Sequence, residues 1–358
     1  MSKAAELAAL IGSQTALSNR NLIINGAMAV VQRGGSATTS NRTVDRFLNT
    51  YGGATITQSQ DTTVPSGEGF SFSYKHECTT ASSSAGAFFG IFYRVEAQDI
   101  RNSGWNYTDP NSRITLSFYA RSSVAGTYMA SLESNDGTVY NIASRYTLEA
   151  NTWKRVVLNF PGNSNITIDN DNGSGLMVFP LKEYGSSYTT GSSFDTWTAH
   201  TTGTQSPDAN INIHDTANAT FFVTGVQLEV GEQVTPFEHR SFADELARCQ
   251  RYYQVVGSSS NYCAYPAQRW NASAVFFSVS TPTSMRAAPT LGSDISGNFG
   301  YLSGNNQSKQ YALSEMTLVS VDNSCVTARV TVGFTPNNQY AYTGYINDGG
   351  ELQLDAEL

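Results

Sequence analysis

The clearest pattern in the middle of the chain is an alternation of hydrophobic and polar residues with a period of two. Ile114, Leu116 and Phe118 alternate with Thr115 and Ser117, and similar short runs recur between residues 21 and 239. Such alternation is typical of antiparallel strands that bury one face. Short strands separated by polar turns predict a β-sandwich or jelly roll. The strands expected here are 70–75, 88–94, 114–119, 127–132, 153–160, 175–179, 210–214 and 222–228.

The pattern changes to a helical period over residues 241–254. Phe242, Leu246, Cys249 and Tyr253 are spaced four, three and four apart, and Ser241 stands where a capping residue belongs. Two interpretations remain open. The helix is either a linker that covers one end of a sandwich, or part of a parallel bundle in which these four residues form an oligomerisation contact.

A second helix and a second group of strands occupy the two ends of the chain. Residues 3–11 are strong helix formers, but a helix this short needs a partner to be stable in water. After the linker the strand pattern returns over 274–280, 316–321, 325–332, 342–347 and 351–354. We therefore expect an all-β protein with four parts: an N-terminal helical segment (1–20), a β-sandwich (21–239), a linking helix (240–254) and a smaller β domain (255–358).

Composition and charge exclude several classes of function. Only 14% of the residues are charged, the net charge is −8, and no Lys/Arg cluster is present, so a nucleic acid is not an expected partner. No apolar run is long enough for a membrane span, and no secretion signal is recognisable, which predicts assembly in a cytoplasm. The four cysteines are widely spaced and lack zinc-type spacing, so we expect no metal and no cofactor.

No catalytic motif is recognisable either. His214 and Asp215 are adjacent, but neighbouring strand side chains diverge, and Glu229 and Glu232 lie in a strand-to-turn segment. The run from Asp169 to Ser174 has oxygen ligands around a glycine but lacks the calcium-loop frame, so a plain turn is expected. The sequence thus predicts a protein that is not an enzyme.

Aromatic residues next to polar ones in loops are candidate sugar contacts. One face of a sugar is apolar and its rim carries hydroxyls, so flat rings beside amides or carboxylates suit it. The alternative is that these rings pack in the core, as most aromatics do. The candidate carbohydrate-binding residues are Trp105, Tyr107, Asp109, Tyr184, Tyr188, Asp195 and Trp197.

Three parts of the chain resemble known proteins. The opening NLIINGAMAVVQRG (21–34) resembles the start of β-domains in tail-fibre and minor structural proteins of bacteriophages. The segments YARSSVAGTY (119–128), WKRVVLNF (153–160) and VTGVQLEVG (223–231) are similar to the jelly roll of carbohydrate-binding modules. The passage TPFEHRSFADELARCQRYY (235–253), with MRAAPT (285–290) and LDAEL (354–358), resembles the distal part of many such phage proteins.

The resemblance implies a structural virion protein of tail-fibre or spike type, assembled in the bacterial host and commonly trimeric. Its β-sandwich would bind host surface polysaccharide. Because the short N-terminal helix needs a partner, we expect Leu7, Leu10 and Ile11 to attach the protein to other virion proteins. The alternative is a capsid decoration, head-fibre or connector protein with no receptor role.

Overall fold

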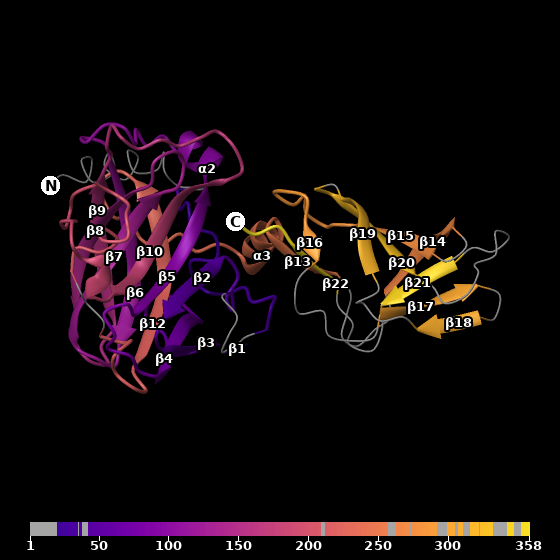
Figure 1. Cartoon of the computed structure of the whole chain (residues 1–358), viewed down its shortest axis with the longest axis horizontal. Helices are drawn as coiled ribbons and strands as arrows, with labels where there is room; N and C mark the ends of the chain where they lie inside the picture. The colour runs from indigo at the N-terminus through magenta and orange to yellow at the C-terminus, as the bar shows by residue number, and fades with distance from the viewer. Residues whose placement is uncertain are drawn as a thin grey trace, which may run out of the picture. The chain divides into compact units, whose positions relative to one another are not determined.

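The protein consists of two compact units, each built mainly from strands (Figure 1). The first unit contains residues 1–245 and Leu358, and the second contains residues 246–357. This computed structural model describes residues 20–34, 36–37, 42–208, 212–256, 263–271, 274–291, 299–304, 307–310, 316–321, 323–331, 342–346 and 352–358. Within these residues the only α-helices are α2 (Ala97–Asn102) and α3 (Phe242–Gln250), so the predicted all-β class is confirmed.

The first unit is a sandwich of two six-stranded antiparallel sheets. Its chain crosses repeatedly from one sheet to the other, as in jelly rolls. The first sheet has the spatial order β1 (Ser36–Ala37), β3 (Thr55–Asp61), β4 (Ser73–Thr80), β12 (Thr220–Val230), β6 (Arg113–Ser122) and β9 (Lys154–Pro161). The second has the order β11 (Thr198–Ala199), β8 (Tyr140–Leu148), β7 (Gly126–Ser134), β10 (Ser174–Tyr184), β5 (Phe88–Glu96) and β2 (Phe47–Gly52).

The core lies between these sheets and comes from alternate residues of each strand. Leu116 and Phe118 of β6 are fully buried, as are Phe89 and Ile91 of β5. Burying a side chain of this size contributes roughly 1.5–3 kcal/mol relative to leaving it in water. The period-two pattern of the sequence therefore specifies which face of each strand points inward.

An irregularity in β10 decides what its outer face presents. The register of β10 against β5 shifts between Val178 and Leu181. Phe179 and Lys182 are three residues apart and would point to opposite faces of a regular strand. The shift brings both to the outer face, where the Lys182 Nζ lies 4.9 Å from the centre of the Phe179 ring.

Helix α3 begins as the sequence predicts. The Ser241 hydroxyl accepts a hydrogen bond from the backbone N–H of Asp244 at 3.1 Å, so Ser241 caps the helix. The helix ends at Gln250, however, and Tyr253 belongs to the next strand. The expected helical stripe through residue 253 is therefore shorter than predicted.

The second unit contains a three-stranded and a seven-stranded antiparallel sheet. The smaller sheet has the order β13 (Tyr253–Val256), β22 (Leu352–Asp355) and β16 (Thr290–Leu291). The larger one has the order β18 (Gln307–Gln310), β17 (Phe299–Gly304), β21 (Tyr342–Ile346), β14 (Cys263–Asn271), β15 (Ala274–Ser280), β20 (Cys325–Thr331) and β19 (Met316–Val321).

Among the described residues, no helix is long and apolar enough to cross a membrane.

One predicted strand is wrong. Asn212 to His214 form turns, and residues 209–211 lie outside the described ones. The cause is a buried carboxylate on β10: Glu183 accepts hydrogen bonds from the backbone N–H groups of Asn212, Ile213 and His214 at 3.1–3.2 Å. These backbone groups are thus satisfied without a neighbouring strand.

Candidate functional site

Trp105 and Trp197, two of the predicted sugar contacts, pack in the core of the sandwich. Their exposed fractions are 3% and 8%. The Trp105 indole donates to the carbonyl of Ser112 at 3.4 Å, and the Trp197 indole donates to the carbonyl of Pro161 at 2.8 Å. Protein therefore covers both rings, and neither offers a sugar platform in this structure.

The remaining predicted loop residues hold their own loops in place. Tyr107 packs partly against the core, and its hydroxyl accepts a hydrogen bond from Arg101 at 2.7 Å. Asp109 accepts one from the backbone N–H of Asn111 at 2.9 Å. Asp195 is exposed, and its carboxylate accepts a hydrogen bond from the Ser144 hydroxyl.

Tyr184 and Tyr188 do come together, on the outer face of the second sheet. Their ring centres are 5.1 Å apart, and each ring lies about 6 Å from the ring of Phe88, at 5.9 and 6.0 Å respectively. Tyr184 is the last residue of β10 and Phe88 is the first of β5, and these two residues are directly paired. Three aromatic rings thus form one group at this end of the face.

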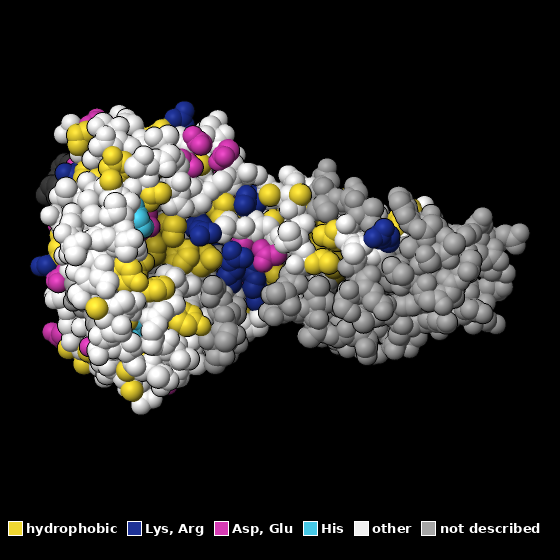
Figure 2. All heavy atoms as spheres, viewed as in Figure 1, with side chains coloured by type: hydrophobic (Ala, Val, Ile, Leu, Met, Phe, Trp, Pro, Cys, Tyr) yellow, Lys and Arg dark blue, Asp and Glu magenta, His cyan; other side chains and the backbone are white. Residues whose placement is uncertain are grey.

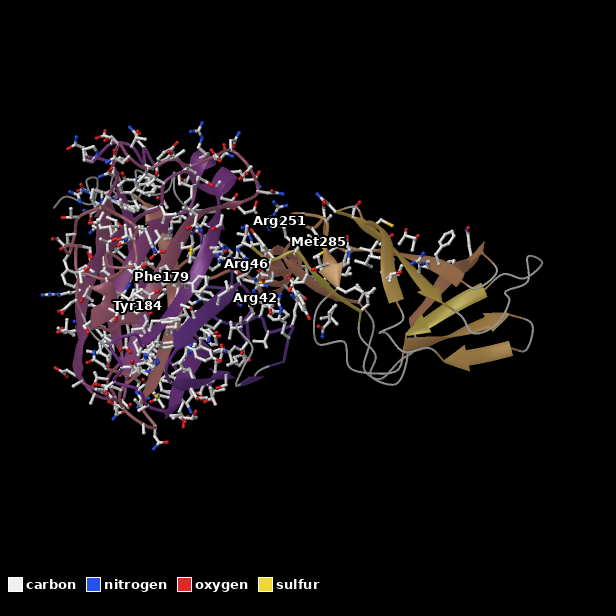
Figure 3. The ribbon with its side chains drawn as sticks, in the orientation of Figure 1. Arg42, Arg46, Phe179, Tyr184, Arg251 and Met285 are labelled. Carbon is white, nitrogen blue, oxygen red and sulfur yellow. The ribbon has the colours of Figure 1, made fainter. Side chains whose placement is uncertain are left out.

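An apolar strip continues this aromatic group across the same face. Leu48, Phe92 and Phe179 form a buried cluster that is separate from the core, and Met177 packs against it. Figure 2 shows hydrophobic side chains gathered over β2, β5 and β10, and Figure 3 labels Phe179 and Tyr184 in the same region. Apolar side chains on the outer side of a sheet are the feature that a solvated sheet face normally lacks.

A buried ion pair lies beneath the aromatic group. Lys182 of β10 is fully buried and contacts the carboxylate of Glu133 of β7. Its ammonium lies 4.9 Å from the Phe179 ring centre and 5.0 Å from that of Tyr184, within the range of cation–π attraction. The pair therefore holds both rings in position. His200 lies next to it, with its Nδ1 3.9 Å from the second Glu133 oxygen.

A pocket of about 300 Å³ opens on the same sheet face, over β7 and β8. The guanidinium of Arg145 stacks 3.9 Å from the centre of the Phe194 ring, and it pairs with Asp208 at 3.3 Å. The two charged side chains are 55% and 57% exposed, so both are open to a ligand. The pocket is lined by Thr127, Tyr128, Met129, Arg145, Phe194, Asp208 and Asn212.

One wall of the pocket depends on Glu183. Its carboxylate is fully buried on the inner side of β10 and binds the backbone of residues 212–214, next to the lining residue Asn212. Burial raises the pKa of Glu183 to about 8, although the three backbone N–H groups act in the opposite direction. Glu183 thus positions this wall without contacting the pocket surface.

The other predicted site residues lie in different surroundings. Of the proposed oligomerisation stripe, Phe242 is 60% exposed and Leu246 is half-buried, whereas Cys249 and Tyr253 are buried within the chain. The proposed attachment residues Leu7, Leu10 and Ile11 lie outside the described residues.

The described part contains no group of three or more His, Cys, Asp or Glu side chains that is arranged to hold a metal ion. In the run from Asp169 to Ser174, the carboxylate of Asp171 accepts a hydrogen bond from the N–H of Gly173 at 2.8 Å, as in an ordinary turn.

Glu229 is not free for catalysis. Its carboxylate accepts hydrogen bonds from the Thr235 backbone N–H at 2.9 Å, the Thr235 hydroxyl at 2.6 Å and the Gln227 amide at 3.1 Å. A carboxylate with this many donors has a structural role.

His214, the histidine of the adjacent His214–Asp215 pair, is buried. Burial lowers the pKa of His214 to about 4, so this imidazole is neutral near pH 7.

Comparison with known proteins does not assign the chain to a family. No known protein family and no curated protein matches the sequence. Similar solved structures include an enzymatically active domain of tailspike protein 4 of bacteriophage CBA120, with 13% identity over 59% of this chain and a TM-score of 0.33. That match spans 22% of the tailspike chain. Two others are matched over nearly their whole length. One is a putative sugar-binding protein from Bacteroides thetaiotaomicron, which is 13% identical. The match covers 59% of this chain and 100% of that protein, with a TM-score of 0.33. The other is a family 11 carbohydrate-binding module from Clostridium thermocellum, which is 14% identical. The match covers 59% of this chain and 99% of the module, with a TM-score of 0.29.

Proposed function

We propose that this chain is a bacteriophage tail-fibre or spike protein that binds host surface glycans through the outer face of its second sheet. The observation that carries the glycan part is the pocket in which the Arg145 guanidinium covers Phe194 and faces Asp208. A flat surface with donors and acceptors at its rim suits a sugar ring, because hydroxyls both donate and accept hydrogen bonds. The virion part is supported by the resemblance of residues 21–34 and 235–253 to phage structural proteins.

Several copies on one particle would strengthen this binding. A shallow sugar site is weak when it acts alone, and presenting several linked sites raises the overall affinity by mass action. We therefore propose a trimer attached to the particle through the N-terminal segment, with binding and not catalysis as its role. Among the described residues, the one carboxylate that lines the pocket is that of Asp208, which is paired with Arg145, and the carboxylate of Glu183 behind the wall is bound to the backbone.

A second candidate function is that of a capsid decoration, head-fibre or connector protein with no receptor role. The observation in its favour is that four of the predicted sugar contacts, Trp105, Tyr107, Asp109 and Trp197, stabilise the fold in this structure.

Labelling of intact virions separates the two functions. An antibody raised against residues 255–358 would be imaged on the particle, alongside binding of the purified full chain to host cells. Tail labelling with saturable cell binding supports the fibre or spike. Head labelling without cell binding supports the decoration protein and contradicts the receptor role.

A further inference from the structure

The pocket over β7 and β8 also indicates which class of sugar it takes. We infer that it binds a neutral sugar unit through two adjacent hydroxyl groups, which Arg145 and Asp208 recognise together. This inference rests on the proposed glycan-binding function and adds to it the chemistry of the ligand.

The charges of the pocket favour a neutral ligand. In the part of the chain that the structure describes, its lining contains one cation, Arg145, and one anion, Asp208, which pair at 3.3 Å. A uronic acid or a phosphorylated sugar would have to compete with Asp208 for the guanidinium and would be repelled by that carboxylate. No second Lys or Arg among the described residues lines the pocket to offset the repulsion, and the net charge of the whole chain is −8.

The geometry of the pair matches two neighbouring hydroxyls. A guanidinium only donates hydrogen bonds and a carboxylate only accepts them, whereas each sugar hydroxyl does both. Two adjacent hydroxyls can therefore bridge the pair, one accepting from Arg145 and the other donating to Asp208. Because Arg145 is stacked on Phe194 and pairs with Asp208, its fork is held in place before a sugar arrives.

The size of the pocket limits the ligand. A volume of about 300 Å³ is at the small end of the range of roughly 300–1,000 Å³ for small-molecule sites, which leaves room for roughly one or two sugar rings. Met129 is almost fully buried at its floor, and Asn212 forms the wall that Glu183 holds.

Titration calorimetry of the full chain with paired oligosaccharides tests this inference. The probes are neutral hexose tetrasaccharides and the uronic-acid tetrasaccharides that differ from them only by oxidation at C6. We expect a neutral tetrasaccharide to bind, and its acidic counterpart to bind at least about tenfold more weakly. A tenfold difference in affinity corresponds to the loss of one charge-assisted contact. Arg145→Ala and Asp208→Ala should each weaken the neutral ligand by about tenfold or more.

The control is a second aromatic surface on the opposite sheet. Trp153 is half-buried there and lies 6.3 Å from the Phe222 ring, with the Arg121 guanidinium 5.3 Å from the centre of the Phe222 ring. Trp153→Ala should leave the affinity unchanged. Both Arg145 and Asp208 are more than half exposed, so their variants should fold normally, which circular dichroism checks.

The outcomes separate the inference from the function on which it rests. Tighter binding of the acidic probes, with a further gain in Asp208→Asn, overturns the inference but leaves glycan binding intact. Sugar binding that Trp153→Ala abolishes and Arg145→Ala leaves unchanged also overturns it and moves the site to the other sheet. If neither these probes nor host polysaccharide binds, the proposed function fails together with the inference.

Discussion

At the scale of single residues, the Glu133–Lys182 pair is the most sensitive point of the candidate face. Its two side chains are 7% and 0% exposed, so removing the Lys182 charge leaves the Glu133 carboxylate buried beside His200 alone, whose Nδ1 lies 3.9 Å away. Such a change costs about 3–5 kcal/mol, whereas replacing both partners by apolar residues is often close to neutral. We expect Lys182→Met to lower the free energy of unfolding by about 3 kcal/mol, and added Glu133→Leu to restore most of it.

Urea unfolding followed by circular dichroism checks this prediction. The control is Lys75→Met, which breaks a more exposed pair with Glu77 and should cost less than about 1 kcal/mol. Equal losses in the two single variants would contradict a special role for the buried pair.

Three buried groups predict how stability depends on pH. Burial lowers the pKa of His76 to about 3 and that of His214 to about 4, and it raises the pKa of Glu183 to about 8. Between about pH 4.5 and 6.5 the unfolded chain binds protons on both histidines, while the folded chain binds one on Glu183, so stability rises with pH by about 1.4 kcal/mol per unit. Between about pH 6.5 and 8 only Glu183 holds an extra proton in the folded state, so stability falls at a similar rate.

These groups therefore place the maximum stability near pH 6.5. Unfolding by urea over a pH series should show it, and Glu183→Gln should remove the decline above this pH while roughly doubling the slope below it. A decline that persists unchanged in Glu183→Gln would show that another group causes it.

Residues of the candidate site differ in how far the sequence reveals them. Tyr184 and Tyr188 could be singled out as aromatics among serines, and the structure brings them together. Arg145, Phe194 and Asp208 could not, because they come from a strand and two separate loop positions that meet only in the folded chain. Nor does the sequence alone tell that Trp105 and Trp197 are buried.

At the scale of elements, Gly225 lies where the pairing of strand β12 with its neighbour β6 is irregular. The register of β12 against β6 shifts between Thr224 and Gln227, and Gly225 has a φ of 62°. A Cβ at this position would lie 2.5 Å from the Phe70 ring. We expect Gly225→Ala to lower the free energy of unfolding by about 2 kcal/mol, from backbone strain and overpacking together.

Thermal unfolding of Gly225→Ala measures this loss. Gly67→Ala is the matched control, because it also has a positive φ of 80° but meets no atom within 4 Å. If both variants lose equal stability, contact with Phe70 contributes nothing and the cost comes from the backbone alone.

Element prediction succeeded where the period-two pattern is regular and failed where side chains redirect the backbone. Residues 114–119 and 222–228 lie in β6 and β12 as expected. The predicted strand at 210–214 is wrong because the Glu183 carboxyl group accepts hydrogen bonds from the backbone of residues 212–214. The register shift in β10, which turns Lys182 outward, cannot be recognised from the hydrophobic pattern. Strand β8 was missed, since Ser144 interrupts the apolar face that Ile142 and Tyr146 form.

At the scale of the whole molecule, the proposed trimer gives a direct prediction. Phe242 is 60% exposed at the start of α3, whereas Cys249 and Tyr253 are buried within the chain, so Phe242 would contribute most of the contact. Mass photometry should find particles of three times the 38.7 kDa chain mass, and Phe242→Ser should shift them toward single chains. A wild-type protein that is monomeric throughout would overturn the trimer.

Binding of the purified full chain to host cells tests the central claim most directly. Wild-type protein should bind saturably, periodate oxidation of the cell-surface sugars should abolish binding, and the Arg145→Ala/Asp208→Ala variant should bind at least about tenfold more weakly, since two contacts are lost. Trp153→Ala should bind like the wild type. Binding that survives both periodate and the double substitution would contradict glycan recognition by the second sheet.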